Sequence, residues 1–333
     1  MRKLVGLMAA VLMAAAAGVA WADPLPSWKA GDTKAAIIEF VDAVTTPGSP
    51  GYVDPTERIA TFDNDGNLWA EQPAYFQLFY ALDTVKRMAE ADPSLAEKSP
   101  AVKAALDGNM EALMADGHKG LLEVIAVSHA GMATDDFKTS VAAWLETARH
   151  PQTEQPYDHM IYQPMLELLS YLRENGFKTY IVSGGGIDFI RVFSEQAYGI
   201  PPEQVVGSSI RSEFRLEDGA ARTVKLPELF FVDDKEGKPV AINHHIGRRP
   251  IFASGNSDGD LQMLQYTTYG DGPGFALLLH HTDGEREWAY DRESHIGQLD
   301  KALDEAGERG WTVVDMKEDW RTVFPFELET GSQ

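Results

Sequence analysis

One stretch of this sequence decides how the rest is interpreted: Arg58-Ile59-Ala60-Thr61-Phe62-Asp63-Asn64-Asp65-Gly66-Asn67-Leu68-Trp69. Ile59 to Phe62 is a short apolar run, rich in branched and aromatic residues, which predicts a buried strand. The run ends at two aspartates, Asp63 and Asp65, on a turn that contains Gly66. Because open α/β sheets bind ligands at the carboxyl ends of their strands, these carboxylates are candidates for a site. They have the chemistry to share a cation, or to act as a nucleophile and a proton carrier.

The same residues have a plainer interpretation, because Asp, Asn and Gly are common in turns that only reverse the chain. They also resemble the start of a calcium-binding loop. Such a loop closes with a glutamate eleven residues after its first aspartate, and here Ala74 holds that position. A calcium loop is therefore excluded, while a plain turn and a functional site both remain open from this stretch alone.

The composition restricts the class of protein and its partners. The 333 residues suffice for one large domain or two small ones, and 44% of them are hydrophobic, which allows a sizeable core. The formal net charge of −22 makes nucleic acid and anionic membrane surfaces poor partners. There is no cysteine, so any metal site must use oxygen ligands or histidine, and oxygen ligands favour Mg²⁺ or Ca²⁺. The histidines form no convincing cluster, and the pair His280-His281 is expected at the surface or at a strand end.

The first 22 residues have the pattern of a cleavable signal peptide. Arg2 and Lys3 precede an apolar run from Leu4 to Val19, and Ala20-Trp21-Ala22 follows as a small-x-small cleavage site. We expect cleavage after Ala22 and a periplasmic or secreted mature protein that is not held in a membrane. An uncleaved membrane anchor is the alternative, although the apolar run is short for a bilayer.

Apolar periodicity divides the remaining chain into a core and an insertion. Strand-like and helix-like stretches alternate in residues 23–68 and 157–333, which predicts an α/β fold with a Rossmann-like parallel sheet and helices on both faces. Residues 69–156 have only helical patterns and predict an all-helical insertion directly after the aspartate turn. Within the core we expect a hairpin excursion around Phe230 to Val232 and a last helix from about Glu285 to Ala306.

Two further predicted strands also end in unusual chemistry. Phe177 to Val182 is followed by Ser183-Gly184-Gly185-Gly186, in which a hydroxyl and unobstructed backbone N–H groups suit an anion. Pro250 to Ser254 is followed by the acidic run Gly255-Asn256-Ser257-Asp258-Gly259-Asp260. Because the carboxyl ends of parallel strands lie at one edge of a sheet, we expect these segments to meet in one crevice. A flexible turn is the plainer interpretation of the glycines.

Taken in order, the segments resemble the four motifs of the haloacid dehalogenase superfamily, and more closely those of its phosphoserine-phosphatase-like phosphatases. The first motif is Phe62-Asp63-Asn64-Asp65-Gly66-Asn67, and the second is Val182-Ser183-Gly184-Gly185. A lysine forms the third, best matched by Lys238, with Lys235 as the alternative. The fourth is Gly255-Asn256-Ser257-Asp258-Gly259-Asp260-Leu261. The helical insertion falls where such enzymes carry a cap.

The resemblance implies a Mg²⁺-dependent phosphatase that acts on a small-molecule phosphate ester. Asp63 would attack phosphorus and carry the phosphoryl group, and Asp65 would act as general acid and base. Mg²⁺ would be bound by Asp63, the backbone carbonyl of Asp65 and the fourth motif. Ser183, the adjacent Gly184-Gly185 backbone and Lys238 would hold the phosphoryl oxygens.

Because of one departure from the family pattern, the sequence does not determine which residue of the fourth motif binds the metal. The fourth motif usually begins with an acidic metal ligand, and here that position is Asn256, whose amide oxygen contributes no charge. Asp258 and Asp260 are the alternatives for the role. The departure also motivates a second hypothesis, an exported phosphate-ester-binding protein with weak or no catalysis. A dehalogenase is disfavoured, because attack on carbon needs neither Asp65 nor a metal.

Aromatic residues at the start of the insertion, together with the acidic composition, indicate the kind of leaving group. They form either a small helical core or a lid that contacts the substrate, and they are Trp69, Tyr75, Phe76, Phe79 and Tyr80. A lid that includes Trp69 would favour an apolar or cationic leaving group, such as a choline-like head. The sequence does not indicate an oligomeric state.

Overall fold

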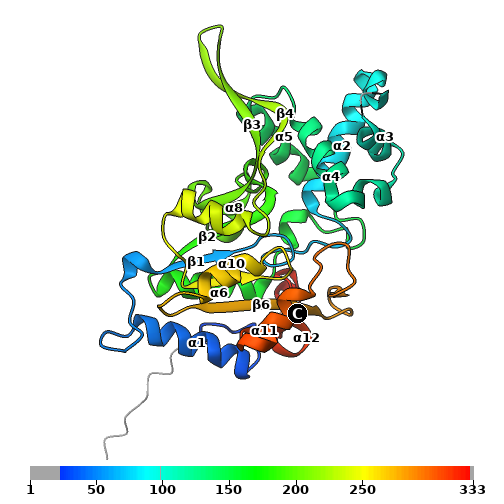
Figure 1. Cartoon of the computed structure of the whole chain (residues 1–333). Coiled ribbons are helices and arrows are strands. Elements are labelled where there is room, and N and C mark those ends of the chain that lie inside the picture. The colour runs from blue at the N-terminus through cyan, green and yellow to red at the C-terminus, as the bar shows by residue number, and fades with distance from the viewer. Residues whose placement is uncertain (1–22, 98, 331–333) are drawn as a thin grey trace, which may run out of the picture.

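The computed structural model describes residues 23–97 and 99–330, and the predicted signal peptide lies outside the described residues. Its centre is a mostly parallel β-sheet (Figure 1). Six parallel strands form it, in the spatial order β3 (Val205–Glu217), β2 (Lys178–Gly186), β1 (Ile59–Phe62), β5 (Phe252–Gly255), β6 (Phe275–Thr282) and β8 (Thr312–Asp315). In the register of β1 with its neighbours, Phe62 pairs with Ile181 of β2 and with Ser254 of β5. The three motif-bearing strands therefore end level with one another, at the same edge of the sheet.

Both faces of this sheet are covered by helices. Alternate strand residues face opposite layers, so Phe252 and Leu277 belong to one apolar cluster, while Ala253 and Leu278 belong to another. The first layer contains α1 (Asp32–Thr45), α6 (Gln163–Glu174) and α12 (Met316–Asp319). The second contains α9 (Gly237–Ala241), the π-helical turn η5 (Ile242–Ile246), α10 (Leu261–Thr268) and α11 (Lys301–Arg309). The predicted α/β fold with helices on both faces is confirmed.

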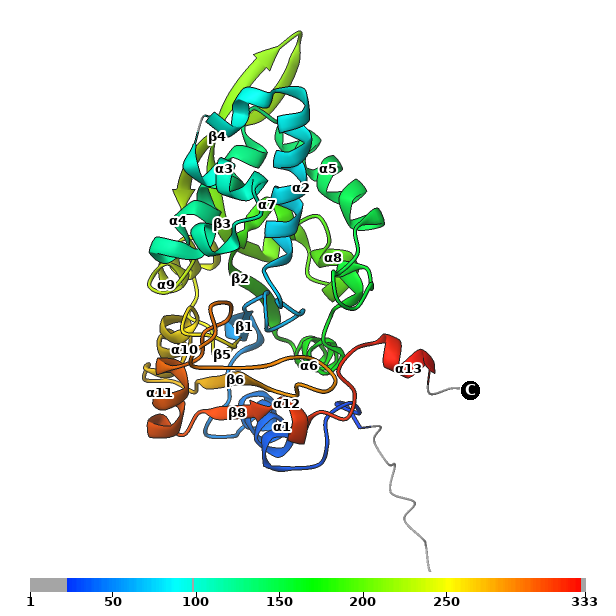
Figure 2. The ribbon, with the colours of Figure 1, turned by 90° about the vertical axis from the view of Figure 1, so that its right-hand side faces the viewer.

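Four helices follow β1 and lie above the sheet (Figures 1 and 2): α2 (Phe76–Ala91), α3 (Pro100–Leu106), α4 (Met110–His129) and α5 (Thr134–Thr147). The first three share an apolar cluster that includes Val85, Val102 and Val124, whereas α5 packs into the cluster beside the sheet. The hydroxyl of Ser99 accepts hydrogen bonds from the N–H groups of Ala101 and Val102, so Ser99 is the N-terminal capping residue of α3. We call this helical layer the cap.

The region predicted as a hairpin excursion around Phe230 to Val232 is a longer hairpin with its turn elsewhere. β3 continues past the sheet and reverses at Asp218-Gly219 into the antiparallel strand β4 (Ala220–Phe231). Both turn residues have positive φ, which Asp-Gly sequences favour in two-residue hairpins. The prediction misplaced the turn because the flanking strands are charged and solvent-exposed rather than apolar.

This hairpin joins the cap, although it is distant from the cap in sequence (Figure 2). The N–H of Gly131 donates to the carbonyl of Lys225 at 2.8 Å, and the N–H of Lys225 donates to the carbonyl of Met132 at 2.9 Å. The layer above this edge of the sheet therefore consists of two separate parts of the chain, the cap helices and the hairpin.

The expectation of a helix from about Glu285 to Ala306 is wrong. Residues 285–300 form a loop that contains the short strand β7 (Ala289–Tyr290), and α11 begins only at Lys301. The side chain of Glu287 is buried in this loop and accepts hydrogen bonds from Tyr162 and from the N–H of Trp288. Tertiary contacts of this kind override the helix propensity of the local sequence.

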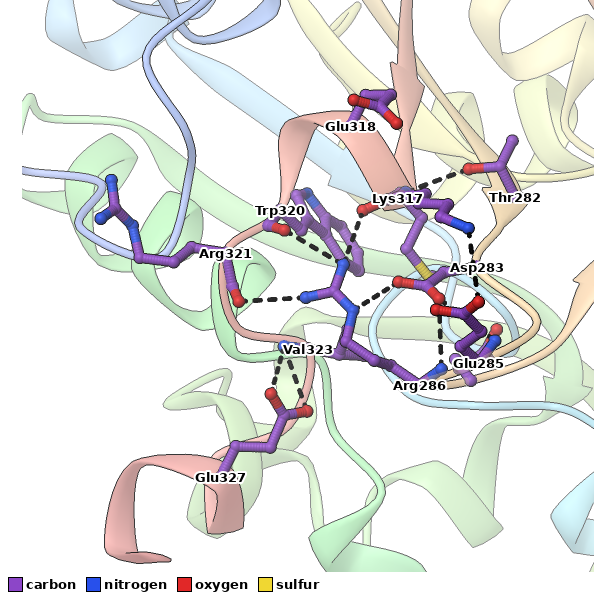
Figure 3. A network of polar contacts seen from close by, with 12 residues as sticks. Thr282, Asp283, Glu285, Arg286, Lys317, Glu318, Trp320, Arg321, Val323 and Glu327 are labelled. Atoms are coloured by element: carbon purple, nitrogen blue, oxygen red, sulfur yellow. Dashed lines mark hydrogen bonds and ion pairs between the residues drawn. The ribbon is translucent and has the colours of Figure 1, made fainter. Parts of the chain in front are cut away.

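Arg286 fastens the C-terminal segment to the end of β6 (Figure 3). Its guanidinium donates to the carboxylate of Asp283 and to the carbonyl oxygens of Trp320 at 3.1 Å and Arg321 at 3.0 Å. Trp320 also packs edge-on against Trp28 near the start of the described chain. The two ends of the described chain thus stabilise the same side of the sheet.

The remaining elements are short: α7 (Ile187–Ile190), α8 (Ser194–Tyr198), α13 (Phe326–Thr330) and the 3₁₀ turns η1 (Pro55–Glu57), η2 (Pro93–Glu97), η3 (Tyr157–His159) and η4 (Pro202–Gln204). Within residues 23–97 and 99–330, none of the helices has the length and apolarity needed to cross a membrane.

Candidate active site

The level strand ends open into a cavity of about 860 Å³ between the sheet edge, the cap and the hairpin. Asp63, Asp65 and Lys238 line it from the sheet side, together with residues 184–186 and 257–259. Leu121 and Ile125 line it from α4, and Lys225 lines it from the hairpin. Segments far apart in sequence therefore line one cavity, at the edge of the sheet where the sequence predicted a site.

Lys238 is the centre of the charged groups on the sheet side. It is 1% exposed, and its Nζ lies 2.9 Å from Oδ1 of Asp63 and 2.6 Å from Oδ1 of Asp260. It also donates to the carbonyl of Val182 at 2.9 Å. Of the two candidate lysines, Lys238 is thus the one in contact with the first aspartate, whereas Lys235 is exposed.

Burial and the closeness of charged neighbours both change the pKa values of Asp63 and Lys238. Burial raises the pKa of the Asp63 carboxyl to about 8, with a further increase from Asp260 and an opposing effect from the Lys238 ammonium. Burial alone would lower the pKa of Lys238, but the carboxylates of Asp260 and Asp63 raise it above its ordinary value. The lysine is therefore a fixed positive charge beside the candidate nucleophile.

Asp65 is held by Trp69. The indole N–H of Trp69 donates to Oδ1 of Asp65 at 2.8 Å, and burial raises the pKa of this carboxyl. A raised pKa favours the protonated form that a general acid needs. Trp69 itself is 1% exposed, stacks on Phe193 at 4.4 Å and does not line the cavity. Its position indicates that it orients Asp65, which corrects the expectation that it contacts the substrate.

The other aromatics of the expected lid also face inward. Phe76 and Tyr80 are fully buried and belong to the same apolar cluster as the sheet. Only Tyr75 of this set lines the cavity. The aromatic residues other than Tyr75 therefore form neither the expected lid nor a separate helical core, because they pack into the main core beside the sheet, and the aromatic argument for a choline-like leaving group loses its basis.

The second motif is anchored by a cap residue that the sequence did not suggest. Ser183 is fully buried, and its Oγ accepts from the N–H of Gly185 at 3.1 Å. The N–H of Gly186 donates to Oε1 of Gln77, on α2, at 2.7 Å. Gln77 lines the cavity, so the cap contacts the glycine turn directly.

The acidic residues of the fourth motif have different partners. Oδ1 of Asp258 accepts from the N–H groups of Asp300 and Ala302 at 3.0 and 2.9 Å, so this oxygen stabilises the start of α11. Asp260 accepts from the N–H of Asn256 at 2.9 Å and contacts Lys238. Asn256 is 1% exposed, and its amide oxygen is buried without a hydrogen-bond partner.

Comparison with known proteins identifies the family of this chain. The family model described as haloacid dehalogenase-like hydrolase matches residues 60–265, which is more than half of the chain. This chain belongs to the haloacid dehalogenase-like hydrolases. The resemblance on which the sequence prediction rested is thereby confirmed, whereas no curated protein matches the chain.

Solved structures with a similar fold include two proteins of unknown function. The one from Anaerococcus prevotii DSM 20548 is 16% identical with a TM-score of 0.53, over 85% of this chain and 91% of that one. The one from Bordetella pertussis Tohama I is 15% identical with a TM-score of 0.51, over 78% and 99%. A phosphoserine phosphohydrolase-like protein from Francisella tularensis is 17% identical with a TM-score of 0.40, over 83% and 100%. At these identities the likeness to the first two shows the fold.

In a haloacid dehalogenase-like hydrolase, a cation is expected beside the first aspartate, and the oxygen atoms here fit one. The unpartnered amide oxygen of Asn256, the carboxylate of Asp63 and the backbone carbonyl of Asp65 are ligands that Mg²⁺ accepts. Within the described ranges, no three His, Asp or Glu side chains converge as a metal site. The candidate ligand set is therefore a mixed one, of a carboxylate, an amide and a carbonyl, rather than an acidic cluster.

Three further buried residues support this site and were missed by sequence reasoning. His281 lies between the carbonyl of Gly66, at 2.7 Å, and the carboxylate of Glu287, at 3.0 Å. Asp233 is fully buried near Lys238, and burial raises its pKa to about 7. Glu71 is 2% exposed and contacts Asn256. Each lies in a loop or at a strand end without a recognisable pattern, so only the fold identifies them.

Proposed function

We propose that this protein is an exported, Mg²⁺-dependent phosphomonoesterase that hydrolyses a small organic phosphate through an aspartyl phosphate on Asp63. One observation carries the proposal: the carboxylate of Asp63 lies 2.9 Å from a buried lysine, and both residues line one cavity together with Asp65. A carboxylate, a proton carrier and a fixed positive charge are the groups that phosphoryl transfer requires.

The chemistry follows from the positions of the two aspartates. An oxygen of Asp63 forms a bond to phosphorus while the ester P–O bond breaks, and its electron pair stays on the leaving oxygen. Asp65 donates its proton to that oxygen. A water molecule then attacks phosphorus and gives its proton to Asp65, and cleavage of the bond to Asp63 releases inorganic phosphate. The hydrogen bond from Trp69 holds Asp65 in place for both proton transfers.

The groups that bind the phosphoryl oxygens come from the second and third motifs. Ser183, the adjacent Gly184-Gly185 backbone and Lys238 are the proposed ligands, as the resemblance implies. The proposed Mg²⁺ ligands are Asp63, the carbonyl of Asp65 and Asn256. When bound, the cation offsets the negative charge of the phosphate, which otherwise opposes attack by a carboxylate.

The second candidate is an exported binding protein for phosphate esters, and one observation favours it. Asn256 provides one negative charge fewer than the usual acidic ligand, which would weaken the binding of a cation. Tight binding of a phosphate ester without turnover would support this candidate. A dehalogenase is the least favoured interpretation, because Asp65 and its hydrogen bond to Trp69 have no role in attack on carbon.

The test of the proposed function is hydrolysis of an aryl phosphate by the wild type and by Asp63→Asn, with Mg²⁺, with Ca²⁺ and with a chelator. We expect Mg²⁺-dependent turnover that falls by at least about a thousandfold in the variant, because the amide is not a nucleophile. Asp218→Asn is the matched control, since Asn-Gly suits the exposed hairpin turn as well as Asp-Gly does. Normal metal-dependent turnover by Asp63→Asn would refute the proposal.

Export is tested separately. Expression of the full chain in a bacterial host should yield a protein outside the cytoplasm whose first residue is Asp23, as cleavage after Ala22 requires. N-terminal sequencing of the periplasmic and culture-medium fractions measures this, and an uncleaved N-terminus in the membrane fraction would support an anchor instead.

A further inference from the structure

The part of the cavity that the cap and the hairpin line carries aliphatic side chains. Leu121 and Ile125 line it from α4, and Leu229 and Val232 line it from the end of the hairpin. Leu229 and Val232 are each 41% exposed, although large apolar side chains are more often buried. Exposed apolar side chains that gather in a cavity are typical of a pocket for an apolar ligand.

A second space adjoins the cavity along the cap. It is a groove of about 400 Å³ that α3, α4 and the hairpin line. Apolar side chains make up most of its lining, and they include Leu95, Val102 and Val127. Two leucines line both the groove and the cavity, Leu122 from α4 and Leu229 from β4. The two spaces therefore meet at this pair of side chains.

The ionisable groups of the cap side offer little to a charged leaving group. Lys225 and Asp188 line the cavity, and they pair with each other. His129 also lines it, and burial lowers its pKa to about 3, so the ring is neutral near pH 7. In the groove, Lys119 and Glu123 are exposed to water. Apolar contact is therefore the main interaction that this side of the site provides.

We propose that the leaving group is a linear alkyl chain, so that the substrate is a phosphate monoester of a long-chain alcohol. Its phosphate lies at Asp63, and its chain runs along α4, passes Leu122 and Leu229 and enters the groove. The inference rests on the proposed function, and it names the class of substrate for the same site. An alkyl chain suits this lining because each CH₂ group that leaves water stabilises the complex. Hydrolysis breaks the P–O bond to the chain, and the alcohol oxygen takes the proton of Asp65.

The test compares butyl, hexyl, octyl and decyl phosphate as substrates. Each ester is used with Mg²⁺ below the concentration at which it forms micelles, so that the protein meets single molecules in water. Release of inorganic phosphate gives kcat/KM for each ester. We expect kcat/KM to rise about two- to fourfold for each added CH₂ until the groove is filled. Equal values for butyl and decyl phosphate would overturn the inference.

Leu229→Ser tests the junction of the two spaces, with Phe230→Ser as the matched control. Leu229 lines both spaces, whereas Phe230 follows it in β4, is 74% exposed and belongs to neither lining. The ratio of kcat/KM for decyl phosphate to that for butyl phosphate should fall at least about fivefold in Leu229→Ser, because a hydroxyl replaces the apolar contact. The control should keep the ratio of the wild type. The same ratio in both variants would contradict the proposed path of the chain.

Pro227→Trp tests whether the chain enters the groove. Pro227 is exposed, and it lines the groove but not the cavity. The larger indole should fill part of the groove, so that kcat/KM stops rising at a shorter chain than it does in the wild type. A dependence on chain length that is the same as in the wild type would place the chain elsewhere and overturn the inference.

The proposed function is tested separately, with the aryl phosphate. A wild type that hydrolyses this ester with Mg²⁺, and loses the activity in Asp63→Asn, retains the proposed function even when chain length has no effect. If the wild type hydrolyses none of the esters, titration calorimetry with the four alkyl phosphates gives their dissociation constants. Affinity that increases with chain length then supports the apolar site without the proposed reaction, whereas equal affinities overturn it.

Discussion

Two lysines are buried in the described part of the chain, and their surroundings differ. Lys238, on α9, contacts Asp63 and Asp260, which are themselves 8% and 0% exposed. Lys225, on the hairpin, pairs with Asp188 and lies 5.1 Å from the ring centre of Phe137. The side chain of Asp188 retains 19% of its exposure. Lys238 is surrounded by buried carboxylates, whereas Lys225 joins the hairpin to the cap and to α7.

We infer that this difference separates a lysine placed for the proposed chemistry, Lys238, from a lysine that stabilises the packing of the hairpin, Lys225. Two buried carboxylates around one ammonium are costly to desolvate, and such an arrangement is retained at functional sites. A single pair that partly contacts water at a junction of three segments serves to fix them in one arrangement. Both lysines line the same cavity, so location alone does not distinguish their roles.

The largest expected effect on stability and on turnover is that of Lys238→Met. Removing the ammonium leaves Asp63 and Asp260 buried without a counter-charge, which should cost about 3–5 kcal/mol of unfolding free energy. Turnover of the aryl phosphate should fall at least about a hundredfold, because a fixed positive charge in the transition state is lost. Urea unfolding and steady-state kinetics measure the two effects, and a variant with normal turnover would remove Lys238 from the mechanism.

Lys225→Met should have a smaller effect and of a different kind. Asp188 keeps contact with water, so the expected loss of unfolding free energy is about 1–3 kcal/mol. The double variant Lys225→Met/Asp188→Asn should regain most of that loss, because no unpaired charge remains. Urea unfolding of the two variants gives the comparison. A loss as large as that of Lys238→Met, without recovery in the double variant, would contradict the distinction drawn between the two lysines.

His129, near Lys225 in the cap, predicts a pH dependence of stability. Burial, and then the charge of Lys225, lower its pKa from 6.5 to about 3 in the folded protein. Between these values the unfolded chain binds a proton that the folded chain does not, so stability falls as the pH falls below 6.5. At about 1.4 kcal/mol per pH unit, the loss at pH 5 is about 2 kcal/mol.

His129→Gln removes that titration and should flatten the dependence between about pH 7 and pH 5, as measured by urea unfolding at each pH. His159→Gln, at an exposed position, is the matched control and should behave as the wild type does. An unchanged slope in His129→Gln would show that another group produces the pH dependence.

The sequence predicted the core of the site better than its surroundings. Asp63 and Asp65 were predicted from the strand end that they follow, Lys238 was predicted from the resemblance to the family, and the structure brings the three residues together at one edge. Glu71 and Lys225 were missed because nothing in their neighbouring residues indicates a partner. The true hairpin turn at Asp218-Gly219 was missed because charged strands conceal the apolar alternation that usually marks a hairpin.

By itself the sequence determined the alternation of strands and helices, the edge of the sheet at which the candidate site lies and the residues proposed to act there, because these depend on short-range periodicity and on the order of motifs along the chain. Only the tertiary structure decided that the amide of Asn256 contacts Glu71, that one oxygen of Asp258 binds the start of α11 and that Trp69 donates to Asp65. These are contacts between side chains whose positions depend on the packing of several elements. Their hydrogen bonds are set by distances of a few ångströms, which the order of residues does not encode.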